Sequence, residues 1–236
     1  MKKSDRYALF ADPGAEWRGK PFWSWNGELR EEEIRRQIRV MKQMGLGGYF
    51  MHSRAGLITE YLGDEWFRLI HAGADEGKKC GMEAWLYDED RWPSGSAGGK
   101  VTEDIRCRMK SLVLTEQDPS AFMWTDDVIA CYIAKIDGIN LYDYLPLTRD
   151  TAVSESEKTG ADKPGSWKVL SFRIVPDAPS SNYNGNTYID TMSREATSRF
   201  IELTHEQYKK NCGDRFGSSI KGFSPTNPIA VMPWTI

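Results

Sequence analysis

The chain has 236 residues, of which 31 are Lys or Arg and 34 are Asp or Glu, so its formal net charge is −3. This balance argues against a nucleic-acid-binding surface or a polybasic membrane patch. No apolar run approaches the roughly 20 residues of a membrane helix, and the aromatic content of 12% argues against disorder.

The first third of the chain alternates short apolar runs with amphipathic segments. Residues 21–26 form an aromatic run that a turn closes, and apolar residues spaced by three and four predict a helix over 28–45. Strands are predicted at 48–52 and 82–87, with a helix at 64–79 between them. Strands and helices that alternate at this spacing indicate parallel βα units.

The pattern changes after residue 100. We expect a short helix over 101–109, and then an antiparallel β insertion over 110–180. Its predicted strands lie at 111–115, 128–134 and 167–173. The polar stretch 150–166 is typical of an exposed hairpin loop.

The βα alternation then resumes. Residues 187–190 predict a fourth strand, Ser193 caps a helix that reaches about Cys212, and residues 220–223 begin a fifth strand. A complete barrel of this type takes about 250 residues, and the insertion leaves four units and part of a fifth. We therefore predict the α/β class and a partial (half) TIM-type (β/α) barrel with an antiparallel β insertion. The expected divisions are 1–109, 110–180, 181–223 and a tail at 224–236.

Active sites of (β/α) barrels lie at the carboxyl ends of the strands. Polar and aromatic residues gather at each predicted strand end: Trp25-Asn26, His52-Ser53-Arg54, Tyr87-Asp88-Glu89-Asp90-Arg91-Trp92 and Asp190. Carboxylates accept hydrogen bonds from sugar hydroxyls, and Trp offers a flat apolar face to a sugar ring. The run at 88–92 therefore favours carbohydrate recognition, against the alternative of a solvated acidic loop.

A carboxyl group among like charges can have a raised pKa, as a general acid requires. The catalytic candidates are accordingly Glu89, Asp88, Asp90 and Asp190. The substrate-binding candidates are Trp23, Trp25, Asn26, His52, Arg54, Tyr87, Arg91 and Trp92. Carboxylates also suit hard cations, but no fixed ligand spacing appears, so we expect no metal ion and no cofactor.

The aromatic and His candidates have structural alternatives. We expect Trp23 and Trp25 to face opposite sides of one strand, so that one stacks on substrate while the other packs outside. His52 fits either a substrate contact or a structural hydrogen bond at a strand end. His71 and His205 lie within predicted helices, and we interpret both as structural.

The four cysteines lack the spacing of a metal or redox motif, and we interpret them as free thiols. They are Cys80, Cys107, Cys131 and Cys212. No apolar stretch near the N-terminus is long enough for a signal peptide. We therefore expect a cytoplasmic protein or the mature form of a secreted one.

Three segments carry a resemblance to a known family: Pro21–Gly27, Gly48–Leu57 and Tyr87–Gly99. The chain resembles, over residues of about 15–223, the N-terminal part of α-L-rhamnosidase-type and related (β/α)₈-barrel glycoside hydrolases. The resemblance implies cleavage of glycosidic bonds by carboxylates at the strand ends, without indicating which sugar. A catalytically inactive carbohydrate-binding remnant and a folding product with no natural role are the alternatives.

The resemblance ends at Phe223. Such proteins would continue with Phe-Thr-Asp-Glu-Pro, whose Glu is the expected acid/base or substrate-contacting carboxylate. This chain reads Ser224-Pro225-Thr226-Asn227-Pro228. Loss of one T from TTT TTC ACC GAC GAA CCC yields these residues, so we expect a frameshift after Phe223 in a longer parent. Half a barrel leaves two open strand edges, which predicts a homodimer. The expected partner is an oligo- or polysaccharide, with neither nucleic acid nor membrane.

Overall fold

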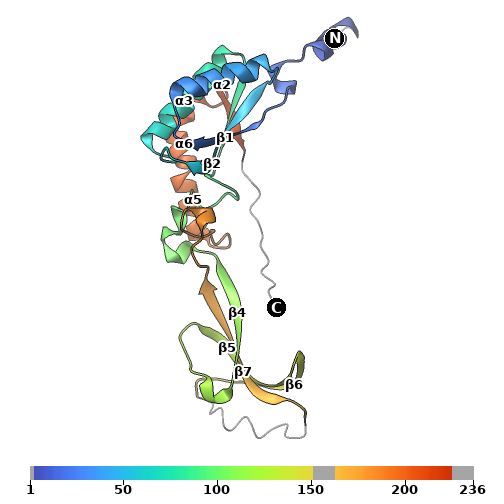
Figure 1. The fold of residues 1–236 in the computed structure, drawn as a ribbon, viewed down its shortest axis with the longest axis vertical. Coiled ribbons are helices and arrows are strands. Elements are labelled where there is room, and N and C mark those ends of the chain that lie inside the picture. Colours follow the sequence, from blue (N-terminus) through green and yellow to red (C-terminus); the bar gives the residue numbers. More distant parts are fainter. Residues whose placement is uncertain (1–2, 151–162, 225–236) are drawn as a thin grey trace. The chain divides into compact units, whose positions relative to one another are not determined.

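The computed structural model describes residues 3–150 and 163–224 (Figure 1). They divide into two compact units, one of residues 3–108 and 178–224 and the other of residues 109–177. The expected tail beyond Ser224 and most of the polar stretch 150–166 lie outside the described residues. Among the described helices, none is long and apolar enough to cross a membrane.

The first unit is built on a four-stranded parallel sheet, and its connecting helices follow the predicted alternation. Its strands, in spatial order, are β1 (Phe22–Gly27), β2 (Gly48–Leu57), β3 (Glu83–Tyr87) and β8 (Ile220–Ser224). Helix α2 (Glu31–Gln43) joins β1 to β2, and α3 (Asp64–Lys79) joins β2 to β3. Three Glu side chains fill the first turn of α2, where the helix dipole stabilises negative charge.

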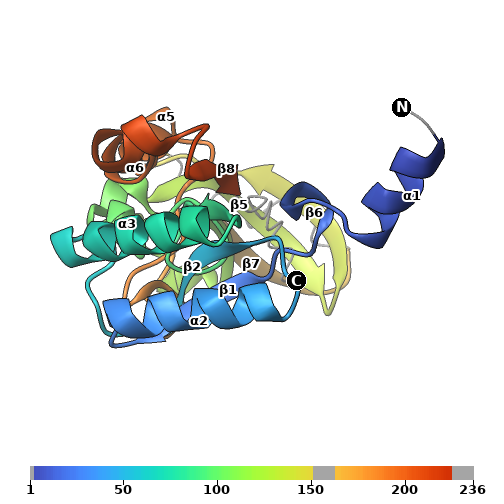
Figure 2. The same ribbon diagram turned by 90° about the horizontal axis from the view of Figure 1, so that it is seen from above.

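The remaining helices of this unit are α1 (Lys3–Ala11), α5 (Arg194–Leu203) and α6 (His205–Cys212). Short 3₁₀ helices of the two units lie at Ala15–Trp17, Val101–Glu103, Ile105–Cys107, Pro119–Ala121, Ser181–Tyr183 and Gly213–Arg215. Figure 2 shows α2, α3 and α6 beside one another, in agreement with their contacts.

The main core fills the space between the sheet and these helices. Trp25 of β1 packs edge-on against Trp66 of α3, with ring centroids 5.2 Å apart. The indole N–H of Trp66 donates to the hydroxyl of Tyr208 on α6 at 3.0 Å. All three side chains are buried. Burial of such large apolar surfaces stabilises the fold, and the hydrogen bond satisfies the two polar atoms it buries.

The expected opposite orientation of Trp23 and Trp25 is wrong. Residues two apart on a strand share one face of the sheet, and the two indoles meet with centroids 5.4 Å apart. Both turn toward α2 and α3. The indole N–H of Trp23 donates to Gln37 of α2 at 2.7 Å.

The fourth strand predicted at 187–190 is also wrong. Ile189 makes one isolated antiparallel bridge to Arg108, and residues 187–190 belong to no strand of the described sheet. The hydroxyl of Thr102 instead donates to the Thr187 carbonyl at 2.8 Å, and the Asp190 N–H donates to the Cys107 carbonyl at 2.9 Å. These bonds tie the segment to residues 100–108. The strand predicted as fifth, β8, therefore lies next to β3.

The helix predicted from Ser193 to Cys212 is interrupted at Thr204. Ser193 caps α5 as expected, since its hydroxyl accepts from the Ala196 N–H. The buried hydroxyl of Thr204 donates to the Phe200 carbonyl at 2.6 Å, and its backbone has φ −115° and ψ −77°. A hydroxyl that bonds back to the preceding turn bends or breaks a helix. The helix expected over 101–109 is likewise reduced to two short 3₁₀ helices.

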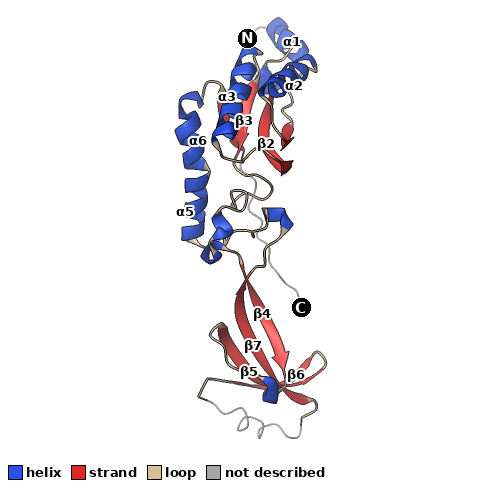
Figure 3. Cartoon of the chain, turned by 60° about the vertical axis from the view of Figure 1, so that its left-hand side comes forward, coloured by secondary structure: helices blue, strands red, loops and turns tan. Residues whose placement is uncertain are grey.

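The second unit is one antiparallel sheet of four strands (Figure 3). Its strands are β4 (Lys110–Gln117), β5 (Val128–Asp137), β6 (Asn140–Pro146) and β7 (Ser166–Pro176), in the spatial order β4-β7-β5-β6. The sequence interpretation missed β6. Its polar and aromatic residues follow a tight turn in which Gly138 has φ +57°, a conformation that glycine adopts without strain.

The structure therefore has a mixed α/β fold with one parallel and one antiparallel sheet. In the described residues the parallel sheet is open, with β1 and β8 at its edges, and it closes no barrel. The four cysteines are free thiols, as predicted.

Candidate functional site

The loop that follows β3, residues 88–99, lies at the carboxyl edge of the parallel sheet. Its three consecutive carboxylates are all buried, with Asp88 and Glu89 each 2% exposed and Asp90 3% exposed. They are therefore not a solvated acidic run. Each carboxylate has a different set of hydrogen-bond partners, and these partners give the three carboxylates different roles.

Glu89 is held by the backbone of its own loop. Its carboxylate accepts from the N–H groups of Asp90, Gly95, Ser96, Ala97 and Gly98 at 2.6–3.0 Å. Burial raises the pKa of Glu89 to about 7, while the backbone hydrogen bonds act to lower it. Five donors converging on one buried carboxylate order this loop. The geometry favours a structural role for Glu89.

Asp88 joins the loop to the start of α6. One oxygen accepts from the Ser94 hydroxyl at 2.6 Å, and the other lies 3.4 Å from Nε2 of His205. His205 was interpreted as structural, and nothing near it in the sequence signals this contact. The two residues are 117 positions apart, so only tertiary folding brings them together.

Asp90 connects three segments at the strand ends. Its Oδ1 accepts from the Ser53 hydroxyl of β2, and its Oδ2 accepts from the Asn184 side-chain amide at 2.8 Å. The Arg91 Nε lies 3.3 Å from the same Oδ2. Sequence reasoning missed Asn184, although Asn184-Gly185 is a recognisable turn signal. Asn184 has φ +55°, and its side-chain amide also donates to the Gly98 carbonyl at 2.9 Å.

A cleft of about 350 Å³ opens beside this loop. It contains three of the predicted substrate-binding residues, Arg54, Arg91 and Trp92, together with Tyr183. Trp92 is 53% exposed. The structure thus brings together a cationic pair and an accessible aromatic face from β2 and the loop after β3.

A second cleft, of about 220 Å³, shares Arg91 with the first. Asp90 and Asn184 line it, as do Tyr61 and Lys100. Asp90 is the only one of the three consecutive carboxylates that lines this cleft. A ligand that spans both clefts would meet Trp92 at one end and the Asp90 region at the other.

His52 and Tyr87 lie together on β2 and β3, with ring centroids 3.7 Å apart. Burial and, to a smaller extent, the charge of Arg54 lower the pKa of His52 to about 4. Among the described residues, no hydrogen-bond partner is within reach of its Nε2 atom. His52 is therefore a neutral imidazole in the folded protein at neutral pH.

Other predicted site residues lie away from these clefts. Trp23 and Trp25 belong to the core face, where with Asn26 they line a pocket of about 100 Å³ against α2. Asp190 closes the turn before α5, because its side chain accepts from the Met192 N–H at 3.0 Å. Asp190 therefore does not lie at the end of a sheet strand, contrary to the sequence prediction.

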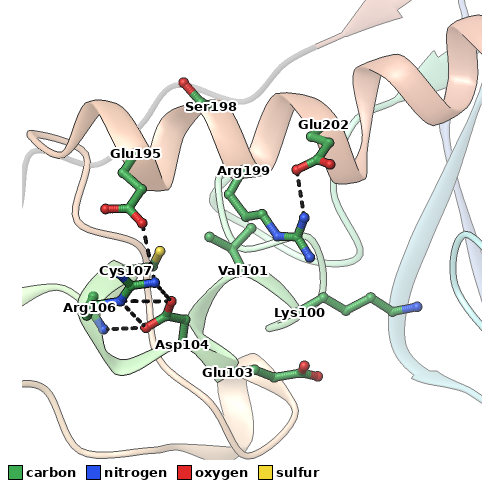
Figure 4. Close-up of a pocket in the computed structure, with 10 residues that line it drawn as sticks. All are labelled: Lys100, Val101, Glu103, Asp104, Arg106, Cys107, Glu195, Ser198, Arg199 and Glu202. Carbon is green, nitrogen blue, oxygen red and sulfur yellow. Dashed lines mark hydrogen bonds and ion pairs between the residues drawn. The ribbon is translucent and has the colours of Figure 1, made fainter.

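A larger cleft of about 530 Å³ lies between residues 100–107 and α5 (Figure 4). Five of its seven charged side chains pair with one another. Arg106 binds Asp104 and Glu195, while Arg199 binds Glu202 (Figure 4). This internal pairing leaves little net charge to attract a ligand. In the described part of the chain, no group of three or more His, Cys, Asp or Glu is placed to hold a metal ion.

Part of this chain resembles a solved structure. No protein-family model matches the chain, and no curated protein matches it. Among solved structures, a rhamnosidase from Novosphingobium sp. PP1Y is similar over 55% of this chain and 14% of that chain, with 19% identity and a TM-score of 0.39. The match spans a small part of that protein. A likeness of this extent assigns neither a family nor a function.

Proposed function

We propose that this chain is a carbohydrate-active protein of the glycoside hydrolase type, which binds an oligo- or polysaccharide at the carboxyl edge of its parallel sheet. The observation that carries the proposal is the 350 Å³ cleft, in which the exposed indole of Trp92 lies with Arg54 and Arg91. Its volume is within the range of small-molecule sites. An indole face suits the apolar face of a sugar ring, and guanidinium groups donate to its oxygens.

Hydrolysis of a glycosidic bond generally requires two carboxyl groups across the scissile bond. The candidates from the sequence are Glu89, Asp88, Asp90 and Asp190, but backbone N–H groups hold Glu89, and Asp190 lies in the turn before α5. We place Asp90 first, because it lines the cleft that adjoins Trp92 and accepts from Ser53 and Asn184. These hydrogen bonds and the nearby Arg91 guanidinium hold the Asp90 carboxyl group in a fixed position beside the cleft.

The test compares the wild-type chain with Asp90→Asn on aryl glycosides and soluble β-glucans. We expect turnover by the wild type and a loss of at least about 100-fold in the variant, with saccharide binding retained. The matched control is Asp137→Asn, because Asp137 is an exposed carboxylate in the β5–β6 turn. Equal turnover in all three proteins would remove Asp90 from the mechanism.

A second candidate is a saccharide-binding protein without hydrolytic activity. The burial of Asp88, Glu89 and Asp90, each at most 3% exposed, favours it. Buried carboxylates whose oxygens already accept hydrogen bonds stabilise a rigid loop as readily as they act in catalysis. Binding without turnover on the same substrates, abolished by Trp92→Ala, would establish this alternative. Trp17→Ala serves as the control, because Trp17 is 80% exposed on a separate 3₁₀ helix.

We also propose that the open parallel sheet is half of a TIM-type barrel and pairs with a second copy of the chain. The support is that, in the described residues, β1 pairs only with β2 and β8 pairs only with β3. Unpaired strand edges favour association. Sedimentation velocity over a range of concentrations tests this proposal, and a monomer throughout would reject it.

A further inference from the structure

The cleft beside Trp92 has an unusual charge for this protein. Its walls carry the guanidinium groups of Arg54 and Arg91, and the other lining residues are Ala55, Trp92, Pro93, Asn182 and Tyr183. None of them is acidic, although the chain as a whole has a net charge of −3. By contrast, the cleft in Figure 4 carries both signs of charge, and most of these charges are paired with each other.

The positive charge of Arg54 is not paired with an acidic side chain among the described residues. It lies near the carboxyl end of β2 and is exposed. Among the described residues it makes no hydrogen bond and no ion pair. Elsewhere in the same unit, arginines such as Arg36 and Arg68 hold carboxylates at the surface. The Arg54 guanidinium is therefore available to a ligand.

Arg91 supplies a fixed positive charge. Its guanidinium donates to the Ser181 carbonyl at 2.8 Å and to the Asn184 side chain, and it lies 3.3 Å from Asp90. The side chain is thus immobilised before any ligand arrives, which reduces the entropy cost of binding. The carboxylate that faces it is buried and also accepts from Ser53 and Asn184.

We propose that this cleft selects saccharides that carry an anionic group, a carboxylate or a sulfate, on the ring that stacks on Trp92. The inference rests on the saccharide site proposed above and names its substrate class. Arg54 binds the anionic group, because guanidinium matches the geometry of both carboxylate and sulfate oxygens. Arg91, whose charge is paired with Asp90, forms a fixed wall of the cleft, and Trp92 and Tyr183 provide the aromatic surface.

The experiment measures binding of four probes by calorimetry at low salt: trigalacturonate, its methyl ester, a sulfated disaccharide and a neutral glucose trisaccharide. We expect trigalacturonate or the sulfated sugar to bind about tenfold more tightly than the neutral probes. Added salt weakens this preference, because ions screen exposed charges. Tighter binding of only one anionic probe identifies which anion the cleft prefers.

Three variants separate charge from stacking. Arg54→Gln abolishes the preference for the anionic probe, because it weakens binding of that probe far more than binding of the methyl ester, and Arg54→Lys restores part of the preference. Arg30→Gln is the control, since Arg30 is an exposed arginine that pairs with Glu28 in the loop between β1 and α2. Trp92→Ala weakens the binding of every probe by a similar factor.

Three results would overturn the inference in different ways. Equal affinity for anionic and neutral probes would reject anion selection while leaving the proposed saccharide site intact. No binding of any probe would reject the saccharide site itself, and the inference with it. Retention of the anion preference in Arg54→Gln would also contradict the role given to Arg54.

Discussion

The Oε1 atom of Glu89 lies 2.6 Å from the backbone nitrogen of Gly98, nine residues further along the loop. Four more backbone N–H groups donate to the same carboxylate. A single side chain thus satisfies the polar backbone of a buried loop that turns repeatedly. The loop in turn holds Asp90 and Trp92 at the clefts.

The first prediction is that Glu89→Gln destabilises the protein by about 3 kcal/mol. The glutamine has only one acceptor oxygen, and its amide hydrogens would face the N–H donors that now bind the carboxylate. Urea unfolding of both proteins measures the difference. Glu103→Gln, at an exposed carboxylate on the 3₁₀ helix Val101–Glu103, should change stability by less than about 0.5 kcal/mol. Unchanged stability in Glu89→Gln would contradict the structural role.

The second prediction concerns the pH dependence of the unfolding free energy that His52 produces. Its pKa falls from 6.5 to about 4 on folding, so between these values the unfolded chain binds more protons than the folded one. Stability due to His52 is therefore present above pH 6.5 and is lost as the pH falls toward 4. The full loss is about 3 kcal/mol. His52→Phe removes the titrating group and keeps a ring beside Tyr87.

The measurement is the difference between wild-type and His52→Phe unfolding free energies from pH 7 to pH 4. Glu89 acts in the opposite direction, because its raised pKa makes protonation favour the folded state between about 4.5 and 7. That contribution is common to both proteins and cancels in the difference. Parallel stability curves for the two proteins would count against a buried, neutral His52.

The third prediction tests the interruption between α5 and α6. Thr204→Val should lower stability by about 1 kcal/mol, because it removes the buried hydroxyl that donates to the Phe200 carbonyl. Thr197→Val, within α5, is a matched control, since its exposed hydroxyl donates to the carbonyl of Ser193 four residues earlier. Thermal unfolding of the two variants compares them. An equal effect at both sites would show that burial of the Thr204 hydroxyl is unimportant.

The fourth prediction uses two glycines with opposite surroundings. A Cβ atom at Gly48 would lie 2.3 Å from the Glu83 carbonyl oxygen on the neighbouring strand, so Gly48→Ala should cost about 1–3 kcal/mol. Gly213 has φ −58° and open space around it. Gly213→Ala should therefore raise stability by about 0.5 kcal/mol, by restricting the unfolded chain. Denaturation of both variants provides the readout.

The sequence by itself determined the elements that depend on local periodicity. Ile34, Ile38 and Met41 recur at helical spacing and are buried on α2, as predicted. The apolar runs at 48–52 and 82–87 are neighbouring parallel strands. Capping by Ser193 was also predictable, because it depends on residues within one helical turn.

Tertiary structure alone decided the elements whose hydrogen bonds reach across the chain. Residues 187–190 have a strand-like composition, but Thr102 and Cys107 bind them outside the sheet. The three carboxylates at 88–90 were identifiable as a group from the sequence. Their separate surroundings were not, because a loop backbone holds Glu89, His205 contacts Asp88 and Asn184 binds Asp90. The contacts of Asp88 and Asp90 join residues about 100 positions apart, and those of Glu89 depend on the turns of its own loop. Neither kind of contact leaves a periodic signal in the sequence, so folding alone distinguishes these neighbouring acids.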